Sequence, residues 1–291
     1  MKETAMALGF FDGVHLGHAK ILETAAEQAS KLDIHSAACS FETHPRAFLS
    51  GCAPQLICGN EERRRLILSH GIEEVVFLPF DRGFADMPPR AFADMLKDKY
   101  GCVLAVCGES YRFGKNAAGR PCDLETFGIK TVMCENVLLD GRIVSSTLIR
   151  ELISEGRVKE AGAALGRPFS LSGRVRHGRG IGRKLGSPTV NAETEKDIIL
   201  PARGVYATRI YIGDNIFGSV TNVGTRPTVS DGKDVSVESF VFGLSGDVYG
   251  EQIKLEFIEK IRDEKRFDGR AELSRQIDRD KLSALRILSE R

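Results

Sequence analysis

The chain has 291 residues, enough to bury one large core or two ordinary ones, and its 42% apolar and 28% charged residues exclude a disordered or collagen-like chain. Lys and Arg total 41 against 40 Asp and Glu, so no strong overall field favours nucleic acid or an anionic membrane as a partner. Any anion must therefore bind at a local site.

The seven cysteines all lie between Cys39 and Cys134 and form no CxxC pair. An odd number without such a pair is typical of reduced thiols that fill a core in a cytosolic protein. The sequence shows neither a basic leader with an apolar stretch nor an apolar run of about 18 residues. We therefore expect a cytoplasmic protein with no membrane partner.

The first half of the chain alternates apolar runs with helical patterns. The apolar runs cover residues 5–8, 34–41, 75–80, 103–107 and 129–134. The helical patterns cover residues 19–32, 61–69 and 90–99. Strands that are buried on both faces and alternate with helices predict an α/β fold, a parallel sheet with helices on both sides. We expect this first domain to span residues 1–166.

The second half changes to a period of two after a short helical stretch at 145–165, which Ser145 or Ser146 can cap. Strand patterns at 204–212 and 216–224 flank a turn, and those at 239–244 and 248–258 flank another at 245–247. These patterns predict an antiparallel β-barrel. A helical pattern at 271–288 predicts a terminal helix on it. We expect the second domain to span residues 167–291.

A candidate anion site follows the first predicted strand. His15 and His18 stand three residues apart in the glycine-rich segment GFFDGVHLGH, where a strand turns into a helix. Ring N–H groups at a helix N-terminus can stabilise a phosphate. Two alternatives are a helix cap with exposed histidines and a metal site with His44 as third ligand. The segments ETHPR, GESYRFG and SSTLIR follow later strands and should reach the same sheet edge.

A second candidate lies in the other half. The segment RVRHGRGIGRK has five Arg or Lys, three Gly and no acid, so it predicts either a triphosphate-binding loop or a solvated basic hairpin. Thr189 and Asn191 follow it, two residues apart, and on a strand their oxygens face one side. Together with phosphate oxygens they could hold Mg²⁺. Glu238 shares a strand face with Phe240 and Phe242, which predicts a carboxylate beside an aromatic pocket or, alternatively, one in water.

These motifs resemble those of the bacterial bifunctional riboflavin kinase and FMN adenylyltransferase family. FDGVHLGH, FETHP, ESYRFG and SSTLIR are similar to the motifs of its Rossmann-like nucleotidyltransferase domain, in the family's order. GRKLGSPTVN, GVYA and NVGTRPT are similar to those of its riboflavin kinase barrel. The resemblance extends from Gly9 to about Asp280.

The resemblance implies two reactions, phosphorylation of riboflavin to FMN by the barrel and transfer of AMP from ATP to FMN by the first domain, both with Mg²⁺. It implies catalytic roles for Glu238 as general base and for His15 and His18 at the ATP phosphates, and metal binding by Thr189 and Asn191. The implied nucleotide-binding residues are Phe11, Asp12, Gly13, Gly17, His44, Arg112, Ser145, Ser146, Thr147, Arg150, Gly178, Gly180, Gly182, Arg183, Gly186 and Pro188.

Two alternatives stay open at this point. Phe10 stands where the family often has Asn, and Ser110 where it commonly has Asn or Asp, which favours a paralogue that keeps the kinase and has weak or absent adenylyltransferase activity. The other alternative is a nucleic-acid-binding barrel module. The near-zero net charge, the absence of Trp and only 7% aromatic residues disfavour that module.

Overall fold

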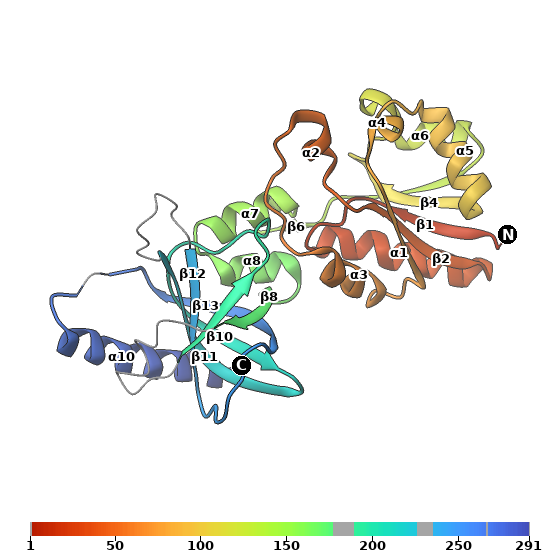
Figure 1. Cartoon of the computed structure of the whole chain (residues 1–291). Coiled ribbons are helices and arrows are strands. Elements are labelled where there is room, and N and C mark those ends of the chain that lie inside the picture. The colour runs from red at the N-terminus through yellow and green to blue at the C-terminus, as the bar shows by residue number, and fades with distance from the viewer. Residues whose placement is uncertain (1, 177–188, 226–234, 266, 291) are drawn as a thin grey trace. The chain divides into compact units, whose positions relative to one another are not determined.

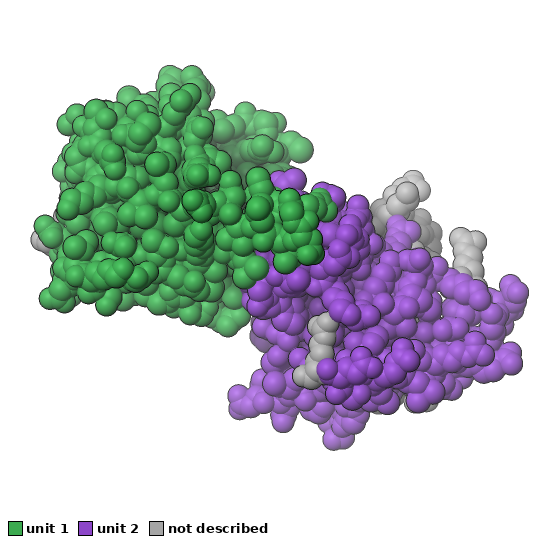
Figure 2. Space-filling view, turned by 180° about the vertical axis from the view of Figure 1, so that it is seen from behind, with its two compact units in different colours: residues 1–146 green, residues 147–291 purple. Residues whose placement is uncertain are grey.

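The structure is a computed structural model that describes residues 2–176, 189–225, 235–265 and 267–290. The chain forms two compact units, residues 1–146 and 147–291 (Figure 2). This division lies before the domain boundary that we predict at 166/167. As the boundary between the two activities, 166/167 stays a prediction. Each unit has its own sheet and its own core.

The first unit contains a five-stranded parallel sheet. Its strands are β1 (Thr4–Leu8), β2 (His35–Phe41), β3 (Glu74–Leu78), β4 (Cys102–Gly108) and β5 (Lys130–Cys134). Their order is β3-β2-β1-β4-β5, so the direction of winding reverses between β1 and β4. In sheets of this kind ligands bind at the carboxyl ends of the strands beside such a reversal. The predicted α/β fold of this half is confirmed.

Helices cover both faces of this sheet (Figure 1). They are α1 (Leu16–Leu32), α2 (Pro45–Ser50), α3 (Asn60–Leu68), α4 (Arg82–Ala85), α5 (Pro89–Tyr100) and α6 (Pro121–Thr126), with a 3-10 turn η1 (Lys115–Ala117) and a small hairpin of β6 (Leu138–Leu139) and β7 (Arg142–Ile143). Alternate residues of β1 point to opposite faces. Ala5 and Ala7 belong to the core that contains Leu22 of α1, while Met6 and Leu8 belong to the core that contains Leu96 of α5.

Five of the seven cysteines are buried, and none of the seven is in a disulfide. Burial raises the pKa of the Cys39, Cys102 and Cys107 thiols to about 12, so these three stay protonated at neutral pH. Cys52 and Cys122 are exposed. The expectation that every cysteine fills the core is therefore wrong for these two.

The second unit begins with two helices, α7 (Ser146–Ser154), whose first residue is the last of the first unit, and α8 (Val158–Leu165). The sequence predicts one helical stretch here, but the chain leaves the helical conformation at Gly156, whose φ is 78°. A Cβ at this position would lie 2.9 Å from the Tyr206 hydroxyl, so the turn requires glycine. Tertiary packing therefore divides the predicted helix.

A closed antiparallel barrel follows. Its strands are β8 (Phe169–Arg176), β9 (Thr189–Thr194), β10 (Gly204–Ile212), β11 (Asn215–Thr225), β12 (Val235–Val241) and β13 (Gln252–Arg262), in the order β10-β11-β12-β9-β8-β13, with α10 (Arg270–Ser289) packed against it. The predicted barrel and terminal helix are confirmed. The hairpin predicted around 245–247 is wrong, because β12 pairs with β9 and β11 while β13 pairs with β8 and β10.

Buried hydroxyl groups join three strands inside the barrel. Thr208 on β10, Thr221 on β11 and Ser239 on β12 are fully buried. The Thr208 and Thr221 oxygens lie 2.6 Å apart, and the Thr221 and Ser239 oxygens lie 2.8 Å apart. These hydrogen bonds satisfy polar groups that burial would otherwise leave unpaired. Ser239 therefore points inward, and its neighbour Glu238 points to the opposite face of β12.

No helix among the described residues is both long enough and apolar enough to cross a membrane.

Candidate functional site

The turn between β1 and α1 has an unusual backbone. Phe11, Gly13 and Val14 all have positive φ, and the Gly13 Cα faces Ile57 so closely that a Cβ would lie 2.7 Å from the Ile57 Cγ2. Asp12 is buried, and its Oδ1 accepts hydrogen bonds from the Ile57 and Cys58 amides at 2.9 and 3.4 Å. Asp12 and Gly13 therefore fix the conformation of the turn through their contacts with Ile57 and Cys58.

His15 is the N-cap of α1. Its Nδ1 accepts a hydrogen bond from the His18 amide at 3.3 Å, and the two rings stack with their centroids 3.6 Å apart. A ring nitrogen that accepts cannot carry the proton, so neutral His15 carries it on Nε2. The cap thus fixes the tautomer and leaves the ring with an N–H group on the side away from the helix backbone.

His44 has the same arrangement at the end of β2. It is the N-cap of α2, and its Nδ1 accepts from the Arg46 amide at 3.2 Å. Its ring meets the edge of the Phe10 ring at a centroid distance of 4.6 Å. Two histidines therefore cap the helices that follow two adjacent strands, each with its N–H on Nε2 when neutral.

A cavity of about 300 Å³ lies at the winding reversal of the sheet, and we call it the histidine cavity. Six residues predicted from the sequence line it, namely Phe11, His15, Gly17, His18, Ser145 and Ser146. The Ser146 hydroxyl donates to the Asp12 carbonyl at 3.1 Å, which ties the segment after β7 to the turn after β1. Thr147 and Arg150, also predicted, lie on α7 in the second unit.

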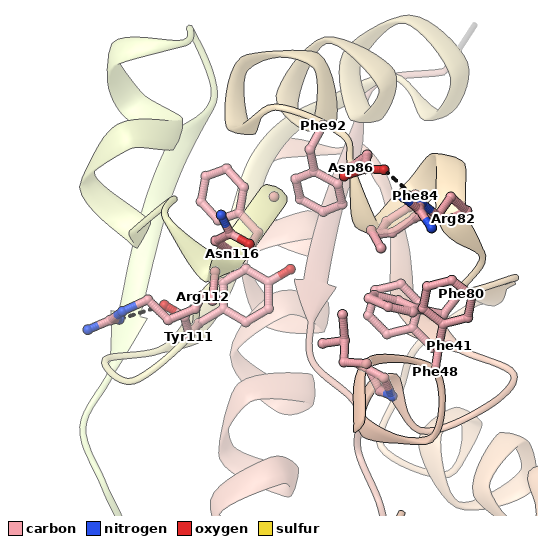
Figure 3. A pocket seen from close by; sticks show the side chains of 16 residues that line it. Phe41, Phe48, Phe80, Arg82, Phe84, Asp86, Phe92, Tyr111, Arg112 and Asn116 are labelled. Carbon is pink, nitrogen blue, oxygen red and sulfur yellow. Dashed lines mark hydrogen bonds and ion pairs between the residues drawn. The ribbon is translucent and has the colours of Figure 1, made fainter. Parts of the chain in front are cut away.

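A larger cavity of about 710 Å³ lies in the same unit, and we call it the aromatic cavity (Figure 3). Its lining includes Phe41, Phe48, Phe80, Phe84, Phe92, Tyr111 and Phe113. In Figure 3 the Tyr111 ring lies across the cavity from Phe41 and Phe80, while Arg112 extends away from the rings. Arg112, predicted to bind nucleotide, also lines this cavity and donates to the Tyr111 carbonyl at 2.7 Å.

Tyr111 lines both cavities, so the two are neighbours. Burial raises the pKa of the Tyr111 phenol well above its usual value, which keeps the hydroxyl protonated at neutral pH. Our sequence analysis did not predict the aromatic cavity. The available signal was the high density of Phe between residues 77 and 92, which lacks a single helical or strand period.

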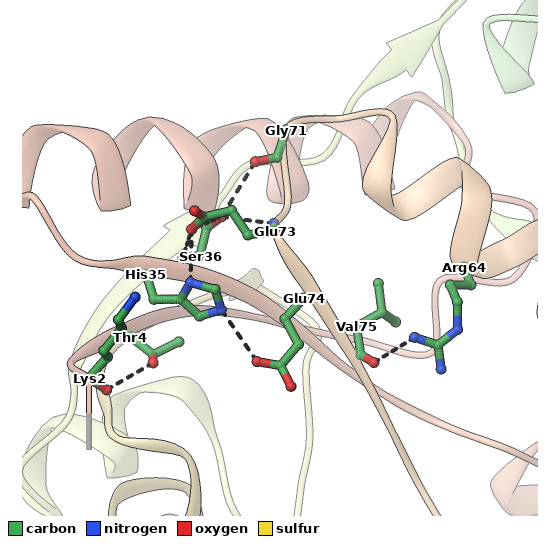
Figure 4. A network of polar contacts seen from close by, with 9 residues as sticks. All are labelled: Lys2, Thr4, His35, Ser36, Arg64, Gly71, Glu73, Glu74 and Val75. Atoms are coloured by element: carbon green, nitrogen blue, oxygen red, sulfur yellow. Dashed lines mark hydrogen bonds and ion pairs between the residues drawn. The ribbon is translucent and has the colours of Figure 1, made fainter.

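A separate cluster of titratable side chains lies near the amino ends of β2 and β3 (Figure 4). His35 lies between Glu73 and Glu74, with nitrogen to oxygen distances of 3.0 and 3.3 Å. A hydrogen bond from the Ser36 amide lowers the pKa of the Glu73 carboxyl. The cluster joins two strands at the edge opposite the cavities. Among the described residues no group of three or more His, Cys, Asp or Glu is arranged to hold a metal ion.

The barrel unit has a cavity of about 340 Å³ between the outer face of its strands and α10. Glu238, Thr189 and Phe240 line it, together with Asn222. Strand pairing places Glu238 opposite Asn191 of β9 and opposite Asn222 of β11. The predicted carboxylate, the two predicted metal ligands and the predicted aromatic side chain are thus gathered on adjacent strands.

An ion pair holds α10 against this cavity. Arg262 at the end of β13 donates through Nε and Nη2 to the carboxylate of Asp280, at distances between 2.8 and 3.1 Å. Gln276 also donates to Asp280 at 2.9 Å. Asp280 is 3% exposed. Removal of Arg262 would leave this buried carboxylate unpaired and would strongly destabilise the fold. The helix wall of the cavity is therefore fixed by a buried charge pair.

Six predicted residues lie outside the described residues, namely Gly178, Gly180, Gly182, Arg183, Gly186 and Pro188. Their assignment to a nucleotide stays a prediction.

Known proteins match the chain over both units. A family model for FAD synthetase matches residues 1–148, and one for riboflavin kinase matches residues 165–288. The bifunctional riboflavin kinase/FMN adenylyltransferase of Bacillus subtilis is 34% identical, covering 99% of this chain and 93% of its own. The chain belongs to this bifunctional family.

A second member of the family and one solved structure are also similar to the chain over most of its length. The Escherichia coli K12 enzyme of this family is 32% identical over 96% of the chain and 91% of its own length. A crystal structure from Streptococcus pneumoniae, described as a macrolide-efflux protein, has 29% identity and a TM-score of 0.91 and covers 97% of this chain and 94% of its own. The structural similarity therefore extends over both units of this chain.

We predict that Gly13→Ala destabilises the first unit more than Gly51→Ala does. Both glycines have positive φ, 75° and 67°, which costs alanine about 1 kcal/mol. Only at Gly13 does the new Cβ collide with a core side chain, which adds about 1–3 kcal/mol. Urea unfolding of the two variants beside the wild type measures the difference. Equal losses would contradict the packing described for this turn.

Proposed function

We propose that this chain makes FAD from riboflavin in two steps, with the barrel unit phosphorylating riboflavin to FMN and the first unit adenylylating FMN to FAD. One observation carries the proposal. The two family models divide the chain nearly as the two compact units do, and each unit has its own cavity lined by residues of its model. A separate cavity in each unit suits two transfers that use the same nucleotide.

In the kinase step, the terminal ribityl oxygen of riboflavin attacks the γ-phosphorus of ATP, and ADP leaves. The hydroxyl proton passes to the carboxylate of Glu238, the general base. The half-buried position of Glu238 beside Phe240 supports this role, because an isoalloxazine ring packed on the aromatic face leaves the ribityl chain within the same cavity. Little further covalent chemistry is required from the protein.

The kinase step also needs a cation at the phosphates, and we propose Mg²⁺ held by Thr189 and Asn191. Their hydroxyl and amide oxygens are neutral hard ligands, which fit Mg²⁺ when phosphate oxygens complete its shell. The pairing of Asn191 with Glu238 puts this donor set beside the proposed base. When bound, the ion neutralises charge on the transferring phosphoryl group.

In the adenylylation step, an oxygen of the FMN phosphate attacks the α-phosphorus of ATP, and pyrophosphate leaves. The Nε2–H groups of His15 and His44 and the ring of His18 are donors for the charge that develops on the phosphates. We propose that Phe11, Gly17, Ser145 and Ser146 surround the nucleotide in the histidine cavity. The aromatic cavity suits the flat isoalloxazine ring of FMN, and the wall it shares through Tyr111 supports a phosphate that reaches the nucleotide.

The other predicted nucleotide contacts, the small-molecule partners and the location belong to the same proposal. Thr147, Arg150 and the glycine and arginine segment 178–188 stay our proposed nucleotide contacts. The small-molecule partners are riboflavin, FMN and ATP, and we propose the cytoplasm, where ATP is made, as the location.

Product analysis tests the proposal directly. Incubation with riboflavin, ATP and Mg²⁺ should give FMN first and then FAD, separated by chromatography and detected by fluorescence. FMN without FAD, even when FMN itself is supplied, would instead support the paralogue without adenylyltransferase activity. Absence of both products would overturn the proposal.

We expect Glu238→Gln to lower FMN formation by about 10²- to 10⁴-fold, because the amide cannot accept the hydroxyl proton. Adenylylation of supplied FMN should be unchanged. Glu193→Gln is the matched control, since Glu193 is an exposed barrel carboxylate paired with Arg176. Both rates are measured on one preparation of each variant. Equal kinase activity in the Glu238 variant and the control would remove Glu238 from the reaction.

We expect the reverse for His18→Ala, a loss of about 10²- to 10³-fold in FAD formation from FMN with riboflavin phosphorylation intact. His70→Ala is the control, because His70 lies in the same unit and pairs with Glu23 away from both cavities. If His18→Ala removed both activities while the protein stayed folded, the assignment of separate sites would be wrong.

A further inference from the structure

Arg63 on α3 is a charged side chain with no exposed surface. Its Nη1 donates to the Phe10 carbonyl at 3.1 Å, and its Nη2 donates to the Phe41 carbonyl at 2.6 Å and to Asn60 Oδ1 at 2.7 Å. Its Nε has no hydrogen-bond partner. The guanidinium is thus bound by neutral oxygens deep in the first unit.

Aromatic rings complete the surroundings of Arg63. The guanidinium carbon lies 4.3 Å from the centroid of the Phe10 ring and 4.8 Å from that of Phe77. Burial lowers the pKa of Arg63, and the nearby Cys58 and Asp12 oppose part of this shift. A buried cation bound only by carbonyls, an amide and ring faces costs desolvation free energy that an apolar side chain would not. Stability alone therefore does not account for an arginine here.

The two carbonyls bound by Arg63 belong to the two segments that carry the capping histidines. Phe10 lies in the turn that leads from β1 to His15, and Phe41 ends β2 just before His44. The Phe10 carbonyl accepts a second hydrogen bond from the Ser40 hydroxyl at 2.8 Å. The planar guanidinium of Arg63 thereby joins the ends of β1 and β2 beyond the last backbone pairs of these two strands.

The ring of Phe10 extends this connection to His44. One face of the ring contacts Arg63, and the ring also meets His44 at 4.6 Å in an edge arrangement. The aromatic ring of Phe10 thus lies in contact with both the Arg63 cation and the His44 ring.

We propose that Arg63 is a positioning residue for adenylyl transfer, which holds the His15 turn and the His44 cap at a fixed offset through the Phe10 and Phe41 carbonyls and the Phe10 ring. This role rests on the proposed function of the first unit. Arg63 is not itself among the residues that line either cavity, so it acts through the two histidine segments. Displacing catalytic donors by about 1 Å can cost 100-fold in rate.

The experiment compares Arg63→Met and Arg63→Lys in the full chain. Methionine keeps much of the volume but makes neither carbonyl contact, and lysine keeps the charge without the planar fork. Arg64→Met is the matched control, because Arg64 is the next residue of α3, donates to the Val75 carbonyl at 2.9 Å and also lies over Phe77. The kcat and the KM for ATP of FAD formation are measured beside riboflavin phosphorylation in each preparation.

We expect kcat for FAD formation to fall about 10- to 100-fold in Arg63→Met, and less in Arg63→Lys, with riboflavin phosphorylation unchanged and Arg64→Met close to wild type. Rates are expressed per folded molecule from near-ultraviolet circular dichroism. If Arg63→Met does not fold, the kcat of Arg63→Lys decides by itself. Wild-type kcat in the folded Arg63 variants overturns the positioning role, whereas a wild type that makes no FAD from FMN overturns the proposed function.

Discussion

Strand direction is the constraint on which all three cavities depend. In the first unit the five strands of the main sheet run parallel, so the segments after β1, β2 and β4 emerge at one edge and bring His15, His44 and Tyr111 to it. In the second unit the closed antiparallel ladder places Glu238 opposite Asn191. Backbone hydrogen bonds set these registers, so the chemical groups occupy positions that the ladders determine before any ligand binds.

The proposed anion sites depend on local hydrogen-bond donors and not on the overall charge of the chain. With a formal net charge of +1, the protein has no general attraction for phosphates. In each capping histidine Nδ1 accepts from a helix amide, which leaves the proton of the neutral ring on Nε2, the atom that we propose as the donor to an anion.

Local patterns predicted the elements well and their partners less well. The alternation of apolar runs and helical periods predicted the parallel sheet, and the period of two predicted the barrel. The turn at 245–247 looked like a hairpin, yet β12 closes the barrel against β9, far from it in sequence. Gly156 divides a stretch that reads as one helix, because Tyr206 of the barrel occupies the space a side chain would need.

The sequence by itself determined most element types and the family and gave the candidate site residues, because periodicity and short motifs are properties of neighbouring residues. The tertiary structure alone decided the aromatic cavity, whose rings come from β2, α2, the segment after β3, α4, α5 and the segment after β4. It also decided the protonated nitrogen of each capping histidine and the burial of Arg63, which the sequence presents as one of three consecutive arginines. Such features depend on which distant groups share one volume, and no local pattern encodes that.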